Sequence, residues 1–342
     1  MSGSDRKYRV AVCGATGAVG REMIRILQER DFPLRDLRLL ASERSCGERI
    51  EFCDEEIAVE TLEESSLKGL DLALFSAGGA VSERFAPCAA DAGCVVVDNT
   101  SAFRMQDDVP LVVPEVNPED LAGYSERGIV ANPNCATIQL VVALKPLHDA
   151  AGLRRVVVAT YQSVSGAGRS GIRELEKQSI DLFNLRALVS ERFPRQIAFN
   201  CLPHIDVFLP EGDTREERKM VDETRKILHL PDLAVCATAV RVPVFYGHAE
   251  AVFAELERPL GAEDARELLE RAPGVQVMDD AAQELYPTPI DAAAGDEVLV
   301  GRIRADGSVP AGLALWVVAD NVRKGAALNS VQIAESLICE YL

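Results

Sequence analysis

Residues 9–20 of the chain read RVAVCGATGAVG. The first five residues are apolar apart from Arg9 and are typical of a short buried strand, and apolar side chains at helical spacing follow the glycine-rich turn. Glycine at positions 14, 17 and 20 allows a tight turn and a close approach of the backbone to a pyrophosphate at the helix N-terminus. The stretch therefore predicts a dinucleotide-binding strand, turn and helix. Because its spacing is G-x-x-G-x-x-G rather than G-x-G-x-x-G, a merely tight turn remains the alternative.

The segment after the second predicted strand, residues 37–41, bears on the choice of cofactor. An NAD-preferring site usually has an acidic residue near the end of this strand, where it holds the ribose 2′-hydroxyl. Here Arg44 lies between two hydroxyl residues, Ser42 and Ser45, which favours a 2′-phosphate and therefore NADP. Glu43 could instead turn toward the ribose and favour NAD.

Three more apolar stretches, residues 70–76, 94–98 and 128–131, read as strands separated by helical patterns. Strands that alternate with helices predict a parallel, doubly wound sheet, so the fold class is α/β with an N-terminal Rossmann-type sheet. Residues 99–104 follow one strand end, on the edge where such sheets bind ligands. Arg104 is therefore either an anion-binding residue or an ordinary surface arginine.

Cys135 lies where the last of these strands, residues 128–131, gives way to a helix. Pro133 prevents the strand from continuing as a paired one, and an apolar stripe at helical spacing starts at Ile138. The start of a helix favours an anion through its unpaired N–H groups and its dipole. This position predicts a lowered thiol pKa and a nucleophilic role for Cys135. The alternative is a small buried residue at a strand-to-helix turn.

Composition narrows the class of protein. The chain has 342 residues, enough for two domains, and its 48% hydrophobic and 26% charged residues are typical of a globular protein. The net charge of −18 argues against a nucleic-acid or membrane surface, and any anionic substrate must be held by local Arg and Lys. Nine scattered Cys and four His give no disulfide framework and no metal motif. Without an apolar span or signal segment, we expect a cytoplasmic protein.

The second half of the chain has a different pattern. Long apolar stretches at residues 154–163, 247–256, 298–303 and 312–318 predict strands with few helices between them, and hence a mostly antiparallel second sheet. Shorter strand-like pieces that contain proline occupy residues 201–207 and 241–244. Residues 325–342 form an amphipathic helical pattern.

Six patches, in the same order and nearly end to end, resemble the aspartate-β-semialdehyde dehydrogenase family: residues 14–20, 132–135, 162–168, 216–219, 241–243 with His248, and 320–326. No single patch would be sufficient. The resemblance implies a Rossmann nucleotide-binding domain at residues 1–133 plus 322–342. It also implies a second, α+β catalytic and dimerisation domain at residues 134–321, which forms a homodimer.

The resemblance also implies the reaction. It is the reversible, NADPH-dependent reductive dephosphorylation of L-4-aspartyl phosphate to L-aspartate 4-semialdehyde, in the biosynthesis of lysine through diaminopimelate and of methionine, threonine and isoleucine. Cys135 is then the nucleophile that forms a thioacyl intermediate, Gln162 orients it and His248 is the acid/base. Cysteine suits this chemistry because it is both a good nucleophile and a good leaving group. A histidine near neutral pKa suits proton transfer.

The remaining site residues are also implied by the resemblance. Arg241 binds the substrate α-carboxylate, Glu216 its amino group, and Lys219 with Arg104 the phosphate, while Asn134 lies beside the reacting carbonyl or phosphate. The residues expected to contact NADP are Thr16, Gly17, Ala18, Val19, Ser42, Arg44, Ser45, Ser76, Gly78, Ser165, Gly166 and Asn321.

Structural interpretations stay open for several of these residues. Gln162 could cap a strand end, Lys219 could belong to a solvated charged face, and His248 could be a satisfied histidine at a glycine turn. We interpret the other three histidines, at positions 148, 204 and 229, as structural.

Rival functions also remain. N-acetyl-γ-glutamyl-phosphate reductase has the same chemistry but needs no partner for a free amino group, so Glu216 discriminates against it. Glyceraldehyde-3-phosphate dehydrogenase is further away, because a different run follows its catalytic cysteine. A non-catalytic homologue should have lost Cys135, Gln162 or His248, and all three are present.

Overall fold

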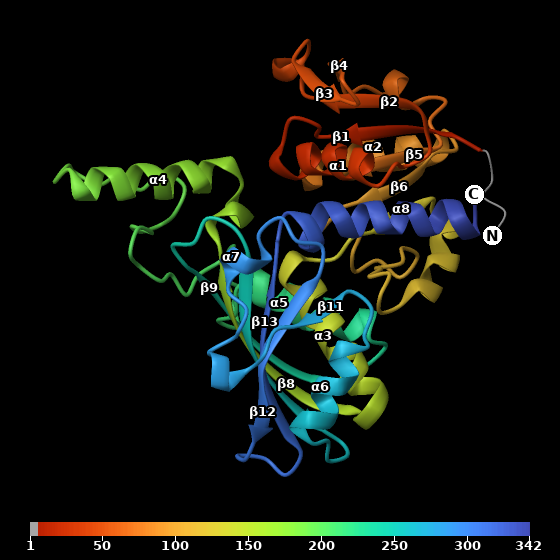
Figure 1. Cartoon of the computed structure of the whole chain (residues 1–342). Helices are drawn as coiled ribbons and strands as arrows, with labels where there is room; N and C mark the ends of the chain where they lie inside the picture. Colours follow the sequence, from red (N-terminus) through yellow and green to blue (C-terminus); the bar gives the residue numbers. More distant parts are fainter. Residues whose placement is uncertain (1–5) are drawn as a thin grey trace. The chain divides into compact units, whose positions relative to one another are not determined.

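The computed structural model of the chain describes residues 6–342. The chain divides into two compact units. The first contains the residues up to Pro133 together with Ala326–Leu342, and the second contains Asn134–Gly325. Each unit contains one β-sheet (Figure 1). Within residues 6–342, no helix is both long enough and apolar enough to cross a membrane.

The sheet of the first unit has the strand order β3-β4-β2-β1-β5-β6-β7. All its neighbouring strands are parallel except β3 and β4, which form an antiparallel pair at one edge. The predicted Rossmann-type parallel sheet is therefore confirmed. The strands are β1 (Tyr8–Cys13), β2 (Leu34–Ala41), β3 (Arg49–Phe52), β4 (Glu55–Thr61), β5 (Leu72–Phe75), β6 (Val95–Asp98) and β7 (Ile129–Ala131).

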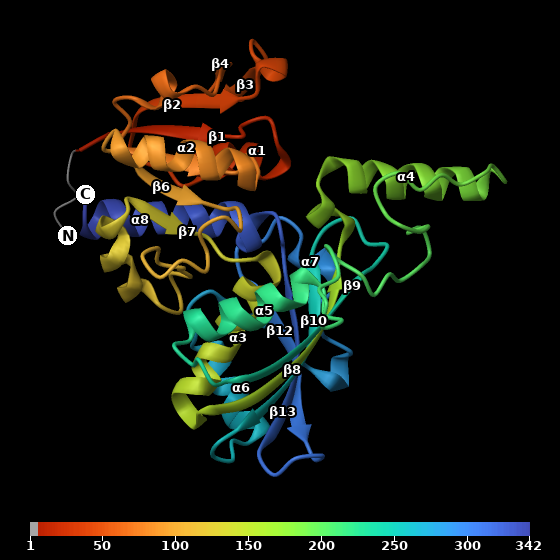
Figure 2. The ribbon, with the colours of Figure 1, turned by 180° about the vertical axis from the view of Figure 1, so that it is seen from behind.

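Helices cover both faces of this sheet. Helices α1 (Ala18–Glu29) and α8 (Leu328–Glu340) share one apolar cluster with the strands, in which Met23, Leu27 and Val331 are fully buried with Val12. Each such side chain contributes about 1.5–3 kcal/mol through burial. Helix α2 (Gly79–Asp91) packs on the opposite face, as Figure 2 shows. Short 3-10 helices η1 (Glu43–Ser45), η2 (Glu64–Leu67) and η3 (Pro118–Glu126) lie in the connections.

The β3–β4 pair was not predicted from the sequence. Both strands are short and have mostly exposed or half-buried side chains, and β4 begins with two charged residues, Glu55 and Glu56. Charged residues on a sheet edge discourage further pairing with another strand. Glu55 and Glu56 are both exposed on this edge.

The sheet of the second unit has the strand order β11-β12-β13-β10-β8-β9. Three of its neighbouring pairs are antiparallel, and two, β8 with β9 and β11 with β12, are parallel, so the sheet is mixed. Its strands are β8 (Leu153–Gln162), β9 (Ala234–Arg241), β10 (His248–Leu256), β11 (Val275–Val277), β12 (Val298–Asp306) and β13 (Gly312–Ala319).

Two strand-like pieces predicted in this region are wrong. Residues 201–207 contribute only a single bridge from Leu202 to Arg241, and residues 241–244 begin where β9 ends. Pro203 and Pro243 lack the N–H that a ladder needs, which is why neither piece becomes a strand. Strand β9 itself was missed, because three of its eight residues are exposed and its small side chains, such as Ala234 and Ala237, give only a weakly apolar pattern.

Helix α3 (Cys135–Ala151) is the central helix of the second unit. Its residues 136–144 are all buried, and it packs on the sheet together with α5 (Arg215–Ile227) and α6 (Ala262–Glu270). Helix α4 (Arg169–Phe183) follows the 3-10 turn η4 (Val164–Ala167) and extends away from the sheet of this unit (Figure 1). The shorter elements are η5 (Ala281–Gln283) and α7 (Pro289–Ala292). A π-helical turn, η6, spans Arg323–Ala327.

Candidate active site

Helix α3 begins with a side-chain cap next to the candidate nucleophile. The Asn134 side-chain oxygen accepts from the backbone N–H groups of Ala136 at 2.9 Å and Thr137 at 3.3 Å. Cys135 is the first residue of the helix and is partly exposed. A Cβ atom at Gly325 would lie 2.9 Å from the Cβ of Cys135, so only glycine leaves room for the cysteine here. The sequence therefore places a thiol at a capped helix start, as predicted.

Helix α5 has Glu216 in its first turn, and a capping box fixes the backbone of that turn. Thr214 and Glu217 form a capping box, in which Thr214 Oγ1 accepts from the Glu217 N–H and Glu217 Oε2 accepts from the Thr214 N–H. The cap fixes the first turn of α5, in which Glu216 is buried, with 6% of the residue exposed.

The Glu216 carboxylate is a hub for three predicted site residues. Its Oε1 accepts from Asn134 Nδ2 at 2.9 Å and from Gln162 Nε2 at 3.2 Å. Its Oε2 accepts from Lys219 Nζ at 3.3 Å, and Lys219 also pairs with Asp206 at 2.9 Å. Lys219 thus joins the buried Glu216 to the more exposed Asp206, and the Gln162 amide bonds to Glu216 rather than capping the strand end. The predicted binding role of Asn134 remains untested.

Arg241 is the last residue of β9 and pairs in register with Gln162 of β8. It is 6% exposed, and its Nη1 donates to the Ser163 carbonyl at 2.7 Å. Burial lowers the pKa of Arg241, whereas the charges of Glu216 and Cys135 raise it. The charge of Arg192 also lowers this pKa, so the guanidinium has a cationic neighbour as well as the acidic hub.

His248 is the first residue of β10 and is fully buried. Its Nδ1 accepts from the Ser163 N–H at 3.2 Å, whereas its Nε2 has no hydrogen-bond partner among residues 6–342. A Cβ atom at Gly166 would lie 3.2 Å from Nε2 and 2.8 Å from Arg241 Nη1, so both groups border the same glycine. A buried ring with an unpaired nitrogen is not a satisfied core histidine, so it calls for a functional explanation.

Burial lowers the pKa of His248 well below its ordinary value, and the nearby Arg241 charge lowers it further. The backbone of Gly247 acts in the opposite direction. Both main causes disfavour the cationic imidazolium.

Asn321 holds the loop behind this histidine. Its side-chain oxygen accepts from Ser163 Oγ and Ser165 Oγ, each at 3.0 Å, and from the Gly247 N–H at 3.1 Å. The role of Ser163 was missed by sequence reasoning. It lies in a patch that carries the family resemblance, but only the pairing of β8 with β10 brings it to the His248 ring.

In the first unit, the candidate cofactor residues gather at the carboxyl ends of β1, β2 and β5. Gly14 has a φ of 94°, and a Cβ there would lie 2.6 Å from the Ser76 carbonyl oxygen, so the turn requires glycine. Thr16 Oγ1 and Ser45 Oγ are 3.3 Å apart, which joins the glycine-rich turn to the segment after β2.

Helix α1 then begins after Gly17, which has no side chain to cap it, and Ala18 and Val19 form its first turn. Ser42, Glu43 and Arg44 are exposed, and Gly78 is the N-cap of α2. Strand ends of this kind form the ligand crevice of doubly wound sheets.

Arg104 is buried in the first unit, so it is not an ordinary surface arginine. Its Nε donates to the Asn132 carbonyl at 2.9 Å and its Nη2 to the Asn99 carbonyl at 2.8 Å. The amides of these two asparagines bond to each other at 2.9 Å, and Asn329 of α8 bonds to Asn132 at 2.7 Å. This network fixes the guanidinium at the carboxyl ends of β6 and β7.

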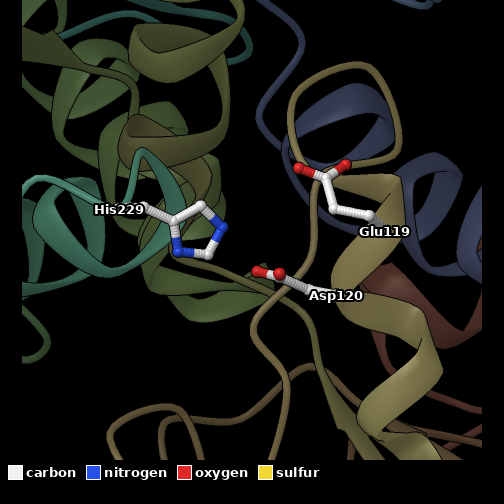
Figure 3. A group of neighbouring side chains, drawn as sticks. All are labelled: Glu119, Asp120 and His229. Atoms are coloured by element: carbon white, nitrogen blue, oxygen red, sulfur yellow. The ribbon is translucent and has the colours of Figure 1, made fainter.

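The contacts described for His148 and His204 are consistent with a structural role for these two histidines. His148 Nδ1 accepts from the Leu153 N–H at 3.2 Å, and the His204 ring stacks on Phe208. Figure 3 draws His229, which has a φ of 56° just beyond α5 in the second unit. It also draws two residues of the first unit, Glu119 and Asp120, in the first turn of η3, where Asp120 accepts from Asn117.

Two family models match the chain. The semialdehyde dehydrogenase NAD binding domain matches residues 9–124, and the semialdehyde dehydrogenase dimerisation domain matches residues 144–324. The fold and these matches define the class as the semialdehyde dehydrogenases, which are oxidoreductases.

Known relatives narrow the class. Aspartate-semialdehyde dehydrogenase of Aquifex aeolicus is 56% identical over 337 residues, which are 98% of this chain and 99% of that protein. Aspartate semialdehyde dehydrogenase II of Vibrio cholerae, in a crystal structure complexed with ASA, is 53% identical with a TM-score of 0.96, covering 98% of this chain and 100% of that one. The Candida albicans enzyme with NADP is 26% identical with a TM-score of 0.75, covering 97% and 99%. The chain belongs to the aspartate-semialdehyde dehydrogenase family, which confirms the resemblance seen in the sequence.

Proposed function

We propose that the chain catalyses the reversible, NADPH-dependent conversion of L-4-aspartyl phosphate to L-aspartate 4-semialdehyde and phosphate through a thioacyl intermediate on Cys135. The observation that carries this proposal is the group of residues around the start of α3. A cysteine at a capped helix start lies in the same unit as Arg241 and His248, which border the same glycine, Gly166. Family membership supplies the substrate class.

Cys135 attacks the acyl phosphate carbonyl, and phosphate leaves from the tetrahedral adduct. The bound nicotinamide then supplies the hydride that reduces the thioester. Gln162, at the end of β8, orients the acyl group, and His248 directs its unpaired Nε2 at the reacting oxygen. Lys219 and Arg104 bind the phosphate. These roles fit the buried, hydrogen-bonded positions of Gln162 and Arg104.

Substrate recognition rests on Arg241 and Glu216. A guanidinium pairs with a carboxylate through two parallel hydrogen bonds, so Arg241 is suited to the substrate α-carboxylate. Glu216 already accepts from Lys219 and from two side-chain amides, and an ammonium group would exchange with these donors. A site that pairs both charged ends of a small amino acid rejects analogues that lack one of them.

The cofactor is proposed to be NADP. The glycine-rich turn brings backbone close to the start of α1, where Gly17 leaves the first N–H groups without a side-chain cap, as a pyrophosphate site requires. Ser42, Arg44 and Ser45 are then the residues that hold the 2′-phosphate. Ser76 and Gly78 in the first unit, and Ser165, Gly166 and Asn321 in the second, are the further proposed cofactor contacts.

A homodimer is part of the same proposal. One face of the second sheet carries exposed aromatic side chains, with Tyr161 40% and Phe253 39% exposed, and Tyr161 contacts Trp316 on that face. The match to a dimerisation domain over residues 144–324 supports covering this face with a second copy.

The reaction is tested in the reverse direction, as phosphate-dependent reduction of NADP with L-aspartate semialdehyde. We expect turnover with this substrate and a kcat/KM lower by roughly 10⁴ for N-acetylglutamate semialdehyde, whose amino group is blocked. Comparable kcat/KM values for the two would contradict the aspartate assignment and favour an N-acetyl-γ-glutamyl-phosphate reductase. Lack of turnover with either would favour a non-catalytic homologue.

A further inference from the structure

Helix α5 holds the residue before the candidate nucleophile at two points. It packs against α3, as Figure 2 shows. Glu216 Oε1 accepts from Asn134 Nδ2 at 2.9 Å, and Glu223 Oε2 accepts from the Asn134 backbone N–H at 2.6 Å. Positions 216 and 223 are about two helical turns apart, so both side chains lie on the same face of α5. Asn134 is therefore fastened to α5 through its side chain and through its backbone.

The backbone of Asn134 decides where the backbone of Cys135 lies. Asn134 is the N-cap of α3, and its side-chain oxygen accepts from two N–H groups of the first turn. Its carbonyl accepts from the Ile138 N–H at 2.9 Å. The Cα atoms of successive residues are about 3.8 Å apart. A shift of Asn134 would therefore be passed directly to Cys135 and to the first turn of α3.

Glu223 is a carboxylate side chain in a buried place, with 1% of the residue exposed. Burying a carboxylate costs free energy unless the group is paired and hydrogen-bonded. A charged acceptor gives a backbone N–H one of the stronger hydrogen bonds, and the start of a helix favours a nearby anion. Both effects favour a carboxylate at this place, and both act on the turn that begins with Cys135.

The two glutamates differ in how a bound substrate would affect them. Glu216 accepts from Lys219 and Gln162 as well as from Asn134, and these are the donors that a substrate ammonium would exchange with. Glu223 holds Asn134 through a backbone N–H, which cannot rotate away as a side-chain amide can. The Glu223 contact therefore persists while Glu216 changes partners.

We propose that Glu223 is a positioning residue for the nucleophile, which keeps the backbone of Asn134 and Cys135 fixed while Glu216 exchanges its donors with the substrate. This inference rests on the proposed function and adds a residue to it. Misplacement of a reacting atom by about 1 Å costs roughly 10²-fold in rate. Loss of Glu223 should therefore lower kcat, whereas KM, which depends on the groups that contact the substrate, should change little.

A pair of substitutions at Glu223 separates the hydrogen bond from the charge. Glu223→Gln keeps an oxygen that accepts from the Asn134 N–H, and we expect it to lose no more than about 10-fold in kcat, because a neutral acceptor gives a weaker bond. Glu223→Leu offers no acceptor. It should lose roughly 10²-fold in kcat, while KM for aspartate semialdehyde stays within about 3-fold of the wild type. Asp222→Asn removes a charge from the adjacent position of α5, so it is the matched control and should keep wild-type kcat.

Hydrogen exchange gives a readout that does not depend on activity. Pro133 has no amide hydrogen, so the first exchangeable backbone amide after Asn132 is that of Asn134. In a peptide covering residues 130–137, we expect one amide to exchange at least about 10-fold faster in Glu223→Leu than in the wild type. Glu223→Gln should exchange as the wild type does. A peptide from β13 is the internal reference and should not change in any variant.

Several results would overturn the inference: a Glu223→Leu variant with wild-type kcat, a rise in KM with kcat unchanged, or a Gln variant as inactive as the Leu variant. Faster exchange in the β13 peptide as well would show a purely structural role and would also count against it.

A Leu variant that does not fold is replaced by Glu223→Asp, whose carboxylate is one methylene shorter. Both kcat and the protection of the Asn134 amide should then fall, and wild-type values for both would contradict the inference. If the wild-type protein does not turn over aspartate semialdehyde, the proposed function fails. The exchange measurement still decides whether Glu223 holds the Asn134 backbone.

Discussion

The two candidate sites of the chain are built differently. In the first unit, the proposed cofactor site is made of backbone turns and exposed side chains, such as Gly14, Gly17 and Arg44. In the second unit, the proposed acyl site is made of buried side chains that bond to one another, with Glu216, Gln162 and His248 all nearly or fully buried. A site made of exposed groups tolerates exchange of one residue at a time. A buried, interlocked site does not, because removing one partner leaves another unsatisfied.

The largest expected effect is in the interlocked site. Cys135→Ala removes the proposed nucleophile and should lower kcat by roughly 10⁴–10⁶, while the fold is retained because the Asn134 cap remains. A steady-state assay measures the loss of kcat, and the melting temperature tests whether the fold is retained. Cys339→Ala, at an exposed position of α8, is the control and should keep both. Substantial activity in Cys135→Ala would show that another group is the nucleophile.

The next largest effect concerns the substrate carboxylate. Arg241→Leu should lower kcat/KM for aspartate semialdehyde by roughly 10³ or more, because a charged end of the substrate then lies unpaired in a buried site. Arg241→Lys keeps a charge but loses the bidentate geometry, and it should fall between Leu and wild type. Arg154→Leu, at an exposed arginine on β8, serves as the control. An Arg241→Leu variant with a normal KM and kcat would remove Arg241 from substrate binding.

A smaller, selective effect is expected in the exposed site. Arg44→Ala should weaken NADPH binding by about 1.5–3 kcal/mol through loss of a charge-assisted hydrogen bond, and leave NADH binding nearly unchanged. Fluorescence titration measures the dissociation constants of NADPH and NADH. Arg49→Ala, on the edge strand β3, is the control variant and should bind both cofactors as the wild type does. An equal loss for the two cofactors would instead assign Glu43 to the ribose and favour NAD.

A further effect is on stability and depends on pH. Burial raises the pKa of Glu250 in the folded chain, so the native state holds a proton that the unfolded state releases. Wild-type stability should therefore fall as pH rises above the unfolded carboxyl pKa of about 4.3, with a slope from this group of at most about 1.4 kcal/mol per pH unit. Glu250→Gln cannot ionise and should be relatively more stable at pH 8 than at pH 5. Denaturant unfolding at the two pH values tests this, and an identical difference at both would contradict it.

The same contrast explains what could be predicted from the sequence. The parallel sheet, the glycine-rich turn and the Cys135 helix are local patterns, and each was predicted from a short stretch. The Glu216 hub was not, because Asn134 and Gln162 are 82 and 54 residues away from it in the chain. Likewise, the Ser163 N–H is an ordinary backbone group with no signature in the sequence, and only strand pairing brings it to His248.

The segment between Asn321 and Gly325 has a consequence for insertions and deletions. Asn321 holds the loop behind His248, and Gly325 makes room for Cys135 four positions later. Deleting one residue between them would bring Ala326 to the place of Gly325 and drive a methyl group into the nucleophile. Inserting one would bring Lys324 there, with a longer side chain. The number of residues in this segment is therefore constrained as strictly as their identity, and length variation should be found in the exposed loops instead.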